Sequence, residues 1–338
     1  MKIQDFYSEA QSFLNQLFFQ MKENQVFIES WWDIDHICFR VSTETEYQQY
    51  RQHFACWGEC LFESEVNGRL ISTFKLYQHI LFENRSIDLV ELPAPKKGKI
   101  VPTGFEHIEV VCEETFEELK KRFAHCQIDD SGLKKEINQE LEINFDRVAL
   151  KFHHLSLESL ICIEKNSALS KAIANLGVLK HFKSFSPLIV GTFPLDLAMD
   201  SSDIDILMFA TDLNFLKNEL AGAYASCDHF QSSLIENELW VKFSFQGYQF
   251  EIFAQPVPSS LQRAALHFQI EERLLKYGGA EFRQKIRGLR QQGLKTEPAF
   301  AQLLNLSGDP YLALLDLQTK PESQIRQMWL TDYRSHKK

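Results

Sequence analysis

The chain has 338 residues, of which 44% are hydrophobic and 24% are charged, with only 14 glycines and 10 prolines. These proportions exclude collagen-like, low-complexity and intrinsically disordered chains, and they indicate a globular protein. At roughly 150 residues per domain, the length predicts two domains.

The net charge of −10 comes from the N-terminal half. Residues 1–165 hold 18 Lys and Arg against 28 Asp and Glu, whereas residues 166–338 hold 18 of each. An acidic total charge argues against broad coating of nucleic acid, so extended nucleic acid is not expected as a partner. Residues 273–295 hold seven basic side chains and only one acid, Glu281. This basic stretch is either a phosphate-facing surface or a solvated helix face.

The start of the chain predicts a cytoplasmic protein. Asp5 and Glu9 stand where a signal peptide would have a basic flank and an apolar run. No segment approaches the roughly 18 consecutive apolar residues of a membrane span, so a membrane is not expected as a partner. The seven cysteines are scattered and form no CxxC pair, which is typical of reduced thiols. The sequence carries no indication of the oligomeric state.

The first half predicts an α+β domain built from a repeat. Apolar residues at helical spacing predict an amphipathic helix over residues 5–22. Short β-branched and aromatic runs then alternate with helix-like stretches at 44–54 and 114–125. The segments DHICFRV (35–41) and EHIEVV (106–111) each consist of an acid, a His, an Ile and a strand, 71 residues apart. They indicate two copies of a unit of one strand, one helix and three strands.

This repeat predicts a metal site. Pseudo-twofold symmetry brings equivalent positions of two similar units together, so His36 and His107 can converge on one point. Glu91, an acid in an apolar strand, needs a partner there. Two imidazoles and a carboxylate suit Zn, Mn, Ni or Fe better than Ca, and His153 is a candidate fourth ligand. The alternative is that each histidine hydrogen-bonds inside a core.

The segments DHICFRV, EVNGRLISTFKL, IDLVELPAP, GFEHIEVV and VALKFHH resemble the YecM family, in the vicinal oxygen chelate (glyoxalase-like) superfamily, over about residues 1–165. The resemblance implies paired βαβββ modules with a metal in the cupped sheet, held from the first and last strands of each module. His36, Glu91 and His107 match this pattern. The fourth ligand in the superfamily is often Glu, whereas this chain offers His153.

In the second half, residues 166–338, the predicted elements are a helix at 168–179, a strand at 187–190 and, from Gly191-Thr192, another helix. Further strands are expected near 203–210, 239–246 and 248–254, followed by a helical C-terminal part. No Pro-rich or Ser-rich linker separates the halves.

Three carboxylates in this half predict a second metal site. Asp203 and Asp205 are separated by one residue and so point to the same side of a strand. Glu251, in an aromatic-rich strand, supplies the third acid. Such carboxylates repel one another unless divalent cations lie between them, as in two-metal phosphoryl-transfer sites. Gly191 and Thr192 would let the backbone approach a phosphate closely. The alternative is a solvated strand end.

The segments LIVGTFPLDLAMDSSDIDILM, FEIFAQPVPSSLQRAALHFQIEERLL and GLKTEPAFAQLLNLSGDPYLALLDL resemble an uncharacterised bacterial family of the polymerase-β-like nucleotidyltransferase superfamily. The resemblance implies Mg or Mn on Asp203 and Asp205, completed by Glu251. It also implies a triphosphate near Arg273 and Lys276, with His267 and Gln262 lining the cleft. Thr192 stands for the usual Ser, Glu251 for the usual Asp, and Asp196-Leu197 for an Arg-Gly pair.

Taken together, these observations predict a vicinal oxygen chelate domain (1–165) fused to a nucleotidyltransferase-like α/β domain with a helical C-terminal region (166–338). The expected activity is metal-dependent transfer of a nucleotidyl group to an unknown acceptor, with a nucleotide or small-molecule substrate. Two alternatives stay open. One is a regulatory protein that only binds metal or nucleotide, and the other is a small-molecule metalloenzyme that acts from the N-terminal site.

Overall fold

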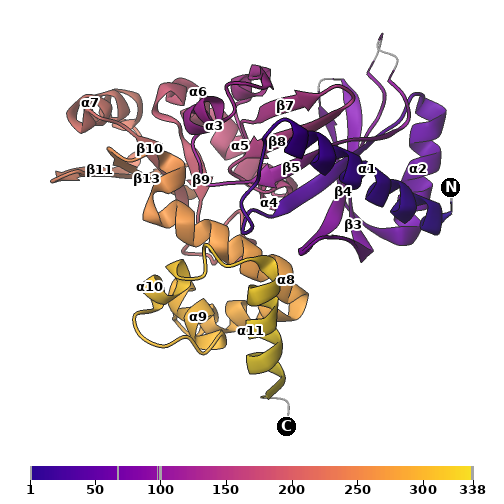
Figure 1. The fold of residues 1–338 in the computed structure, drawn as a ribbon. Coiled ribbons are helices and arrows are strands. Elements are labelled where there is room, and N and C mark those ends of the chain that lie inside the picture. The colour runs from indigo at the N-terminus through magenta and orange to yellow at the C-terminus, as the bar shows by residue number, and fades with distance from the viewer. Residues whose placement is uncertain (1, 67, 97, 99–100, 336–338) are drawn as a thin grey trace. The chain divides into compact units, whose positions relative to one another are not determined.

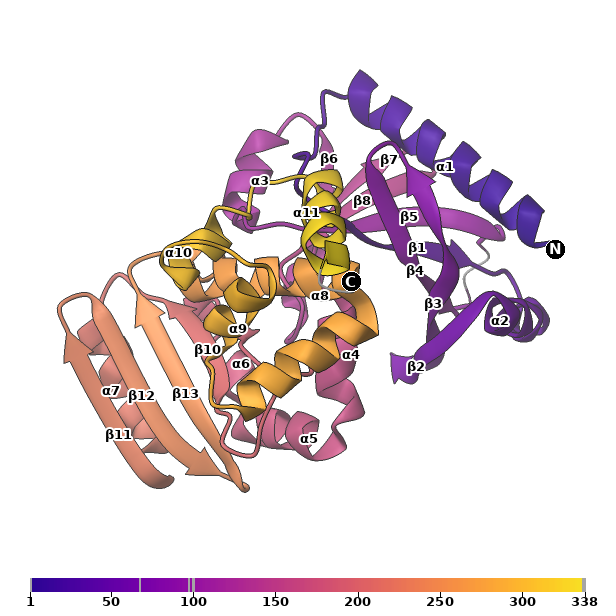
Figure 2. The same ribbon diagram turned by 90° about the horizontal axis from the view of Figure 1, so that it is seen from below.

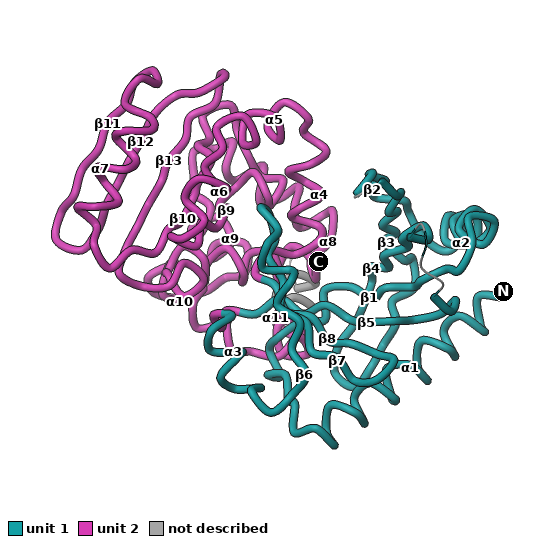
Figure 3. Tube along the Cα trace, turned by 90° about the horizontal axis from the view of Figure 1, so that it is seen from above, with its two compact units in different colours: residues 1–112, 116–153 teal, residues 113–115, 154–338 magenta. Residues whose placement is uncertain are grey.

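The computed structural model describes residues 2–66, 68–96, 98 and 101–335, and of residues 329–335 it describes the backbone only. It divides into two compact units, shown in two colours in Figure 3. Unit 1 comprises residues 1–112 and 116–153, and unit 2 comprises residues 113–115 and 154–338. The predicted domain boundary lies at residue 165, whereas the helix over residues 157–165 packs within unit 2.

Unit 1 contains one sheet of eight strands and three helices among its described residues. In chain order these are α1 (Ile3–Glu23), β1 (Ile34–Arg40), α2 (Glu44–Trp57), β2 (Gly58–Val66), β3 (Arg69–Phe82), β4 (Arg85–Pro93), β5 (Gly104–Val111), α3 (Phe116–Arg122), β6 (Gln127–Asp129), a 3-10 turn η1 (Ser131–Lys134), β7 (Leu141–Phe145) and β8 (Val148–His153). Figures 1 and 2 show the sheet with α1 lying along it.

The strand order β2-β3-β4-β1-β5-β8-β7-β6 confirms the predicted repeat. In each half the first strand pairs in parallel with the last, β1 with β4 and β5 with β8. The two first strands, β1 and β5, pair antiparallel at the centre. Two βαβββ modules are therefore related by a pseudo-twofold axis between β1 and β5.

Alternation along the strands separates two chemically different faces of this sheet. Ile37 and Phe39 of β1, with Ile108 and Val110 of β5, belong to the buried apolar cluster that also contains Phe6 and Leu14 of α1. The intervening residues of the same strands are polar. They include His36, His107 and Glu109, all less than 9% exposed. The polar face of the sheet is therefore buried, which requires partners for its ionisable groups.

Unit 2 is built around a five-stranded sheet of order β11-β12-β13-β10-β9. Its strands and the helices near them are α4 (Leu157–Lys165), α5 (Ser167–Leu176), α6 (Val178–His181), η2 (Lys183–Phe185), β9 (Leu188–Val190), β10 (Ile204–Phe209), α7 (Leu213–Tyr224), β11 (Asp228–Ile235), β12 (Glu238–Phe245) and β13 (Tyr248–Gln255). β10 runs parallel to β13 and antiparallel to β9. Phe243 and Phe250 stack at 5.6 Å on the buried face, against which α7 packs (Figure 1).

The C-terminal part is helical, as predicted. It contains η3 (Ser259–Leu261), α8 (Arg263–Gln291), α9 (Thr296–Leu303), α10 (Pro310–Leu315) and α11 (Glu322–Ser335). α8 is interrupted at Gly279, whose φ of 68° and ψ of −163° are not helical. Gly278 and Gly279 therefore divide α8 into two segments.

The predicted α+β class, with two different domains and a helical C-terminal region, is confirmed. Two details differ. The helix expected after Gly191-Thr192 is absent, because residues 191–203 form turns in which Asp196 adopts a φ of 55°. The prediction also lacked β11, whose alternating exposed and half-buried residues form an edge strand. Among the described residues, no helix is both long and apolar enough to cross a membrane.

Candidate metal and phosphoryl-transfer sites

His36 and His107 occupy equivalent positions of the two modules, on the central strands β1 and β5. In the antiparallel register, Cys38 lies opposite His107 and His36 opposite Glu109. Glu91 of β4 is the parallel neighbour of Cys38. Potential ligand atoms of His36, Glu91 and His107 lie within 4.8 Å of one another. The structure thus brings together three residues that the sequence analysis selected as metal ligands.

Each of these imidazoles is oriented by a carboxylate on its Nδ1 atom. The distance from His36 Nδ1 to Asp35 Oδ2 is 2.9 Å, and the distance from His107 Nδ1 to Glu106 Oε2 is 3.0 Å. The Nε2 atoms of both rings are buried and lie within 3.6 Å of Glu109 Oε1, without a well-formed hydrogen bond. A carboxylate on one ring nitrogen, with the other nitrogen directed into a group of potential ligands, is the usual arrangement of a metal-binding histidine. The residues present therefore fit a transition metal.

Glu109 is the member of this site that the sequence analysis missed. Its Oε1 atom lies 3.2 Å from His107 Nε2 and 3.6 Å from His36 Nε2. Burial alone lowers the pKa of His36, but Glu109 and Asp35 more than offset this effect and raise it to about 10. The signal was present in the sequence, since Glu109 follows His107 by two residues and so shares its side of the strand.

Lys151 occupies the position in the second module that is equivalent to Glu91 in the first. Glu91 faces Cys38 across β4 and β1, and Lys151 faces Glu109 across β8 and β5. Lys151 Nζ lies 3.3 Å from Glu109 Oε1 and 3.4 Å from Glu140 Oε1. Burial raises the pKa of Glu109, but Lys151 and His36 lower it by more. The pKa of Glu109 therefore lies well below its usual value. An ion pair thus occupies the position where a symmetric metal site would have its fourth ligand, a second carboxylate.

His153, the predicted fourth ligand, does not join the group around Glu91. Its Nε2 atom lies 3.5 Å from Asp35 Oδ2, and its Nδ1 atom lies 3.0 Å from Asn138 Nδ2. It forms a second potential ligand group with Asp35 and His36. His153 lies away from Glu91 because of the register of β8 against β5, in which His153 is the neighbour of Val111 and not of Glu109.

Unit 2 places the three predicted carboxylates at one end of adjacent strands. Asp205 of β10 is the direct parallel neighbour of Glu251 of β13, and Asp203 immediately precedes β10. All three lie away from the buried face that Ile204, Ile206, Phe250 and Ile252 line. Burial, followed by repulsion from Glu251 and Asp203, raises the pKa of Asp205 to about 7. The carboxylates are close enough to repel one another. Unlike His36, Glu91 and His107, they are not among the described groups whose ligand atoms all lie within 4.8 Å of one another.

A lysine that the sequence analysis missed lies among these carboxylates. Lys242 of β12 is the antiparallel neighbour of Glu251. Its ammonium group forms an ion pair with Glu251 Oε2 and lies 3.6 Å from Asp203 Oδ2. About half of the Lys242 side chain is exposed, so it can leave this position without opening the core. It lowers the pKa of Asp205 and partly offsets the repulsion between the acids.

Gly191 lies directly against this carboxylate group. Its φ of 79° falls in the left-handed region, and a Cβ built on it would lie 2.0 Å from Asp205 Oδ2. Val190, the residue before it, is the neighbour of Asp205 across β9 and β10. Gly191 therefore brings its backbone against the Asp205 carboxylate, within a turn and not at a helix N-terminus. The close approach to a phosphate stays a prediction.

Three arginines of the basic stretch hold the loop between Gly191 and Asp203. Arg283 donates to the carbonyl oxygen of Leu195, Arg287 to that of Asp196 and Arg290 to that of Leu197. Positions 283, 287 and 290 lie on one face of α8. This part of the basic stretch is neither a solvated face nor a free phosphate surface, because its guanidinium groups bind backbone carbonyls.

Arg273 is also committed to the backbone. It donates to the carbonyl oxygens of Gln318 and Lys320, at 3.0 and 2.8 Å. Lys276 lies one turn further along α8. Gln262 donates to the carbonyl oxygens of Met208 and Val257. The structure therefore gives Arg273 and Gln262 roles in joining segments of unit 2, and the roles expected of Arg273 and Lys276 toward a triphosphate stay predictions.

α8 also carries a buried acid. Glu271 of α8 is 4% exposed, and its Oε1 atom has no hydrogen-bond partner among the described residues. Burial, with repulsion from Glu297, raises the pKa of Glu271 well above its usual value. His267, one turn earlier, contacts the carbonyl oxygen of Tyr311 through Nε2 at 2.9 Å and lies 3.9 Å from Glu297 Oε1 through Nδ1.

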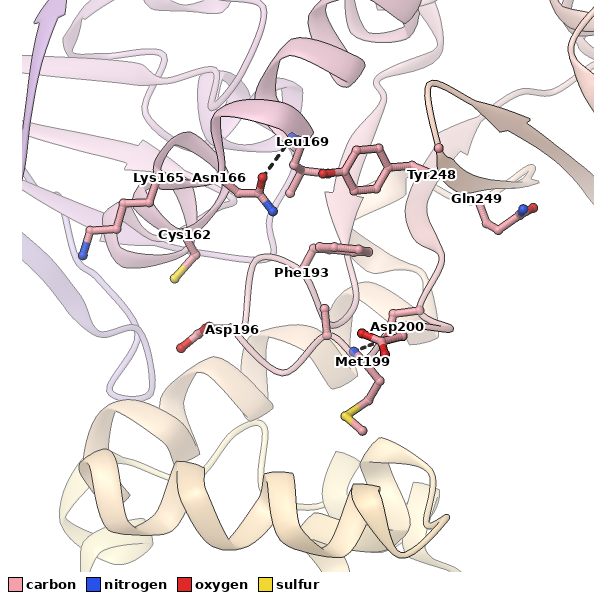
Figure 4. A pocket seen from close by; sticks show the side chains of 13 residues that line it. Cys162, Lys165, Asn166, Leu169, Phe193, Asp196, Met199, Asp200, Tyr248 and Gln249 are labelled. Atoms are coloured by element: carbon pink, nitrogen blue, oxygen red, sulfur yellow. Dashed lines mark hydrogen bonds between the residues drawn. The ribbon is translucent and has the colours of Figure 1, made fainter.

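A pocket of about 750 Å³ lies next to the carboxylates in unit 2. Three segments line it: the end of α4 with the start of α5, the loop over residues 193–202, and the turn between β12 and β13 (Figure 4). Phe193 and Tyr248 stand edge to face in its wall, with ring centroids 6.0 Å apart. The sequence analysis did not anticipate this pocket, because its wall combines segments about 80 residues apart.

Comparison with known protein families finds a match to each half of the chain. Residues 2–164 match the family model described as YecM protein, and residues 171–317 match a domain of unknown function, DUF4269. The chain is 29% identical over 149 residues to Protein YecM of Escherichia coli (strain K12), covering 39% of this chain and 79% of that protein. It is 37% identical over 82 residues to an uncharacterized protein of Haemophilus influenzae, covering 24% of this chain and 43% of that protein.

Two solved structures each match a little less than half of the chain. A structural genomics target, Protein EC4020, matches with 27% identity and a TM-score of 0.42, covering 48% of this chain and 92% of its own. The Cid1 poly(U) polymerase matches with 11% identity and a TM-score of 0.32, covering 46% of this chain and 53% of its own. TM-scores this low carry no argument about chemistry, which depends on the residues of the sites.

Proposed function

We propose that this protein is a metal-dependent enzyme whose second unit transfers a nucleotidyl group from a nucleoside triphosphate to an acceptor hydroxyl. The observation that carries the proposal is the pairing of Asp205 with Glu251 on parallel strands, with Asp203 just before them. Mutual repulsion and burial raise the pKa of Asp205 to about 7, so the arrangement is stabilised when divalent cations bind it. Oxygen ligands of this kind suit Mg or Mn.

The residues of unit 2 fit defined roles in this reaction. Asp203 and Asp205 would hold the cations, which supply neutralisation of phosphate charge when bound. Gly191 and Thr192 would present backbone N–H groups to the triphosphate, since Gly191 lets the chain approach closely. Glu251 would accept the proton of the acceptor hydroxyl. The acceptor oxygen forms a bond to the α-phosphorus, the bond to the bridging oxygen breaks, and pyrophosphate leaves.

Arg283, Arg287 and Arg290 would act as positioning residues. Their guanidinium groups bind three successive carbonyl oxygens of the loop that separates Gly191 from Asp203. Fixing this loop keeps the glycine turn and the carboxylates at a constant separation, and transfer rates depend on such alignment.

For unit 1 we propose a transition-metal site on His36, Glu91 and His107, with Zn, Mn, Ni or Fe as the candidate ions. The grouping of these three side chains and the carboxylates on both Nδ1 atoms support it. The location we propose is the cytoplasm, and the proposed partners are nucleotides or small molecules, without extended nucleic acid. A metalloenzyme acting from this site alone is a second candidate, favoured by the burial of its polar face.

A third candidate is a regulatory protein that binds nucleotide or metal without chemistry. Lys242 favours it, because its ammonium group already neutralises Glu251 and Asp203. The enzyme and the regulatory protein are distinguished by whether a bound triphosphate is turned over. Release of pyrophosphate from a triphosphate in the presence of Mg supports the enzyme, whereas saturable binding without release supports the regulatory protein.

The deciding experiment measures thermal stability of the metal-stripped protein with Mg, Mn, Zn, Ni and Fe(II), alone and with each nucleoside triphosphate. Asp203→Asn and Asp205→Asn should abolish stabilisation by Mg with triphosphate, and the exposed Asp316→Asn should not. His36→Ala and His107→Ala should abolish stabilisation by transition metals, whereas the exposed His125→Ala should retain it. Unchanged shifts in the aspartate variants would remove nucleotidyl transfer from consideration.

A further inference from the structure

The pocket of unit 2 lies beside the group of Asp203, Asp205 and Glu251, and these three carboxylates do not line it. Gly191, Asp205 and Glu251 are not among its lining residues. Ser202, which lines it, directly precedes Asp203. Gln249, also in the wall, lies two residues before Glu251 and therefore on the same side of β13. A ligand held in this pocket can thus reach the carboxylates with one end.

The side chains that line the pocket are suited to binding a flat aromatic ring. Phe193 and Tyr248 come from two different segments and present aromatic surface. Asn166 uses its Oδ1 atom to accept from the Leu169 backbone N–H at 3.1 Å, which leaves its amide NH2 group as a donor. Figure 4 shows this nitrogen on the side of Asn166 that faces Phe193. Aromatic surfaces combined with side-chain amides are the groups that proteins use to recognise heteroaromatic bases.

The charges around the pocket exclude a polyphosphate as its occupant. Lys165 is its one cationic lining residue, and Asp196 and Asp200 are its acids. Asp196 is in turn paired with Arg287. Binding a triphosphate requires several basic groups directed at its oxygens, and the lining does not supply them. The pocket therefore favours a neutral molecule, and its volume of about 750 Å³ lies in the range of roughly 300–1,000 Å³ typical of small-molecule sites.

We infer that this pocket binds the acceptor substrate, and that the acceptor is a neutral nucleoside-like molecule with a heteroaromatic ring and a free hydroxyl. The ring lies against Phe193 and Tyr248 and receives a hydrogen bond from Asn166. The hydroxyl extends past Ser202 to Asp203 and Glu251, where its oxygen attacks the α-phosphorus and its proton passes to Glu251. This inference rests on the proposed function and names the substrate class of the same site.

The test uses the full chain and the four ribonucleosides adenosine, guanosine, cytidine and uridine as probes, with binding measured by ligand-observed NMR in the absence of metal and triphosphate. At least one should bind, and Tyr248→Leu should weaken it about tenfold through loss of base–aromatic stacking. Tyr248→Phe retains the ring and should bind like the wild type. Asn166→Asp keeps the acceptor that caps α5 but loses the donor, so it should also bind more weakly. Asn214→Asp, an exposed position of α7, controls for the added charge.

The two levels of the proposal fail in different ways. If no ribonucleoside binds, or if Tyr248→Leu binds as tightly as the wild type, the pocket assignment is wrong. Stabilisation by Mg with triphosphate that depends on Asp203 would still support nucleotidyl transfer in that case. If a nucleoside binds as expected but this stabilisation is missing, the pocket is correct as a binding site and its role as an acceptor site is overturned.

Discussion

Gly191 packs so closely against Asp205 that a side chain at position 191 would overlap the Asp205 carboxylate. A Cβ on Gly191 would lie 2.0 Å from Asp205 Oδ2, and the φ of 79° independently disfavours any L side chain. Val190 and Asp205 are paired across β9 and β10, so this approach is set by the sheet register. The position of the turn at Gly191 is therefore coupled to the position of the Asp205 carboxylate.

Gly191→Ala is expected to weaken both stability and cation binding, because the methyl group must displace the Asp205 carboxylate. We expect a loss of about 1–3 kcal/mol in the free energy of unfolding, the usual cost of such strain. Urea unfolding and Mg titration measure the two effects. Gly222→Ala, in α7 with nothing within 4 Å of the new methyl group, is the matched control and should be at least as stable as the wild type, because alanine has the higher helix propensity. Equal stability of both variants would contradict the close approach.

Lys151→Met should strongly destabilise unit 1. Lys151 forms an ion pair with the buried Glu109 at 3.3 Å, and its removal takes this lysine partner from a buried carboxylate. Breaking one side of a buried ion pair costs about 3–5 kcal/mol. Chemical denaturation followed by circular dichroism measures the loss, with the exposed Lys22→Met as control. A transition metal should restore part of the stability, since Glu109 lies 3.2 Å from His107 Nε2.

Lys242→Met should change how unit 2 binds Mg without affecting its fold. Lys242 forms an ion pair with Glu251 and lies 3.6 Å from Asp203, so a cation entering the site competes with the ammonium group. Its removal should tighten Mg binding, measured by isothermal titration calorimetry. Weaker Mg binding would instead assign Lys242 a role in orienting the carboxylates. Lys183→Met, at an exposed position of the same unit, should leave Mg affinity unchanged.

Glu271→Gln should alter the pH dependence of stability. Burial and Glu297 raise the pKa of Glu271 well above its ordinary value of 4.5, so the folded protein retains a proton that the unfolded chain has lost. The wild type therefore loses stability as the pH rises above about 4.5, up to the folded pKa, and the variant does not. The difference in melting temperature, variant minus wild type, should be more positive at pH 8 than at pH 4. A difference independent of pH would mean that Glu271 is ionised in the folded protein.

The two modules of unit 1 illustrate how far the sequence alone leads. The repeated His-Ile motifs around His36 and His107 were enough to predict paired βαβββ units and the convergence of the two rings. The spacing of Asp203 and Asp205 likewise indicated two neighbouring carboxylates, which do repel each other, although Asp203 lies just before β10 and not within it. Such inferences succeed because strand periodicity and internal duplication are local properties of the chain.

Only the tertiary structure decided which partners complete each site. Lys151, and not His153, is the counterpart of Glu91, because the register of β8 against β5 depends on a pairing that no local pattern specifies. The ion pair of Lys242 with Glu251 depends in the same way on the register of β12. Arg283, Arg287 and Arg290 looked like a basic surface in the sequence, yet they bind a loop about 90 residues earlier. Charge and periodicity identify which residues can act, but long-range packing determines which groups they contact.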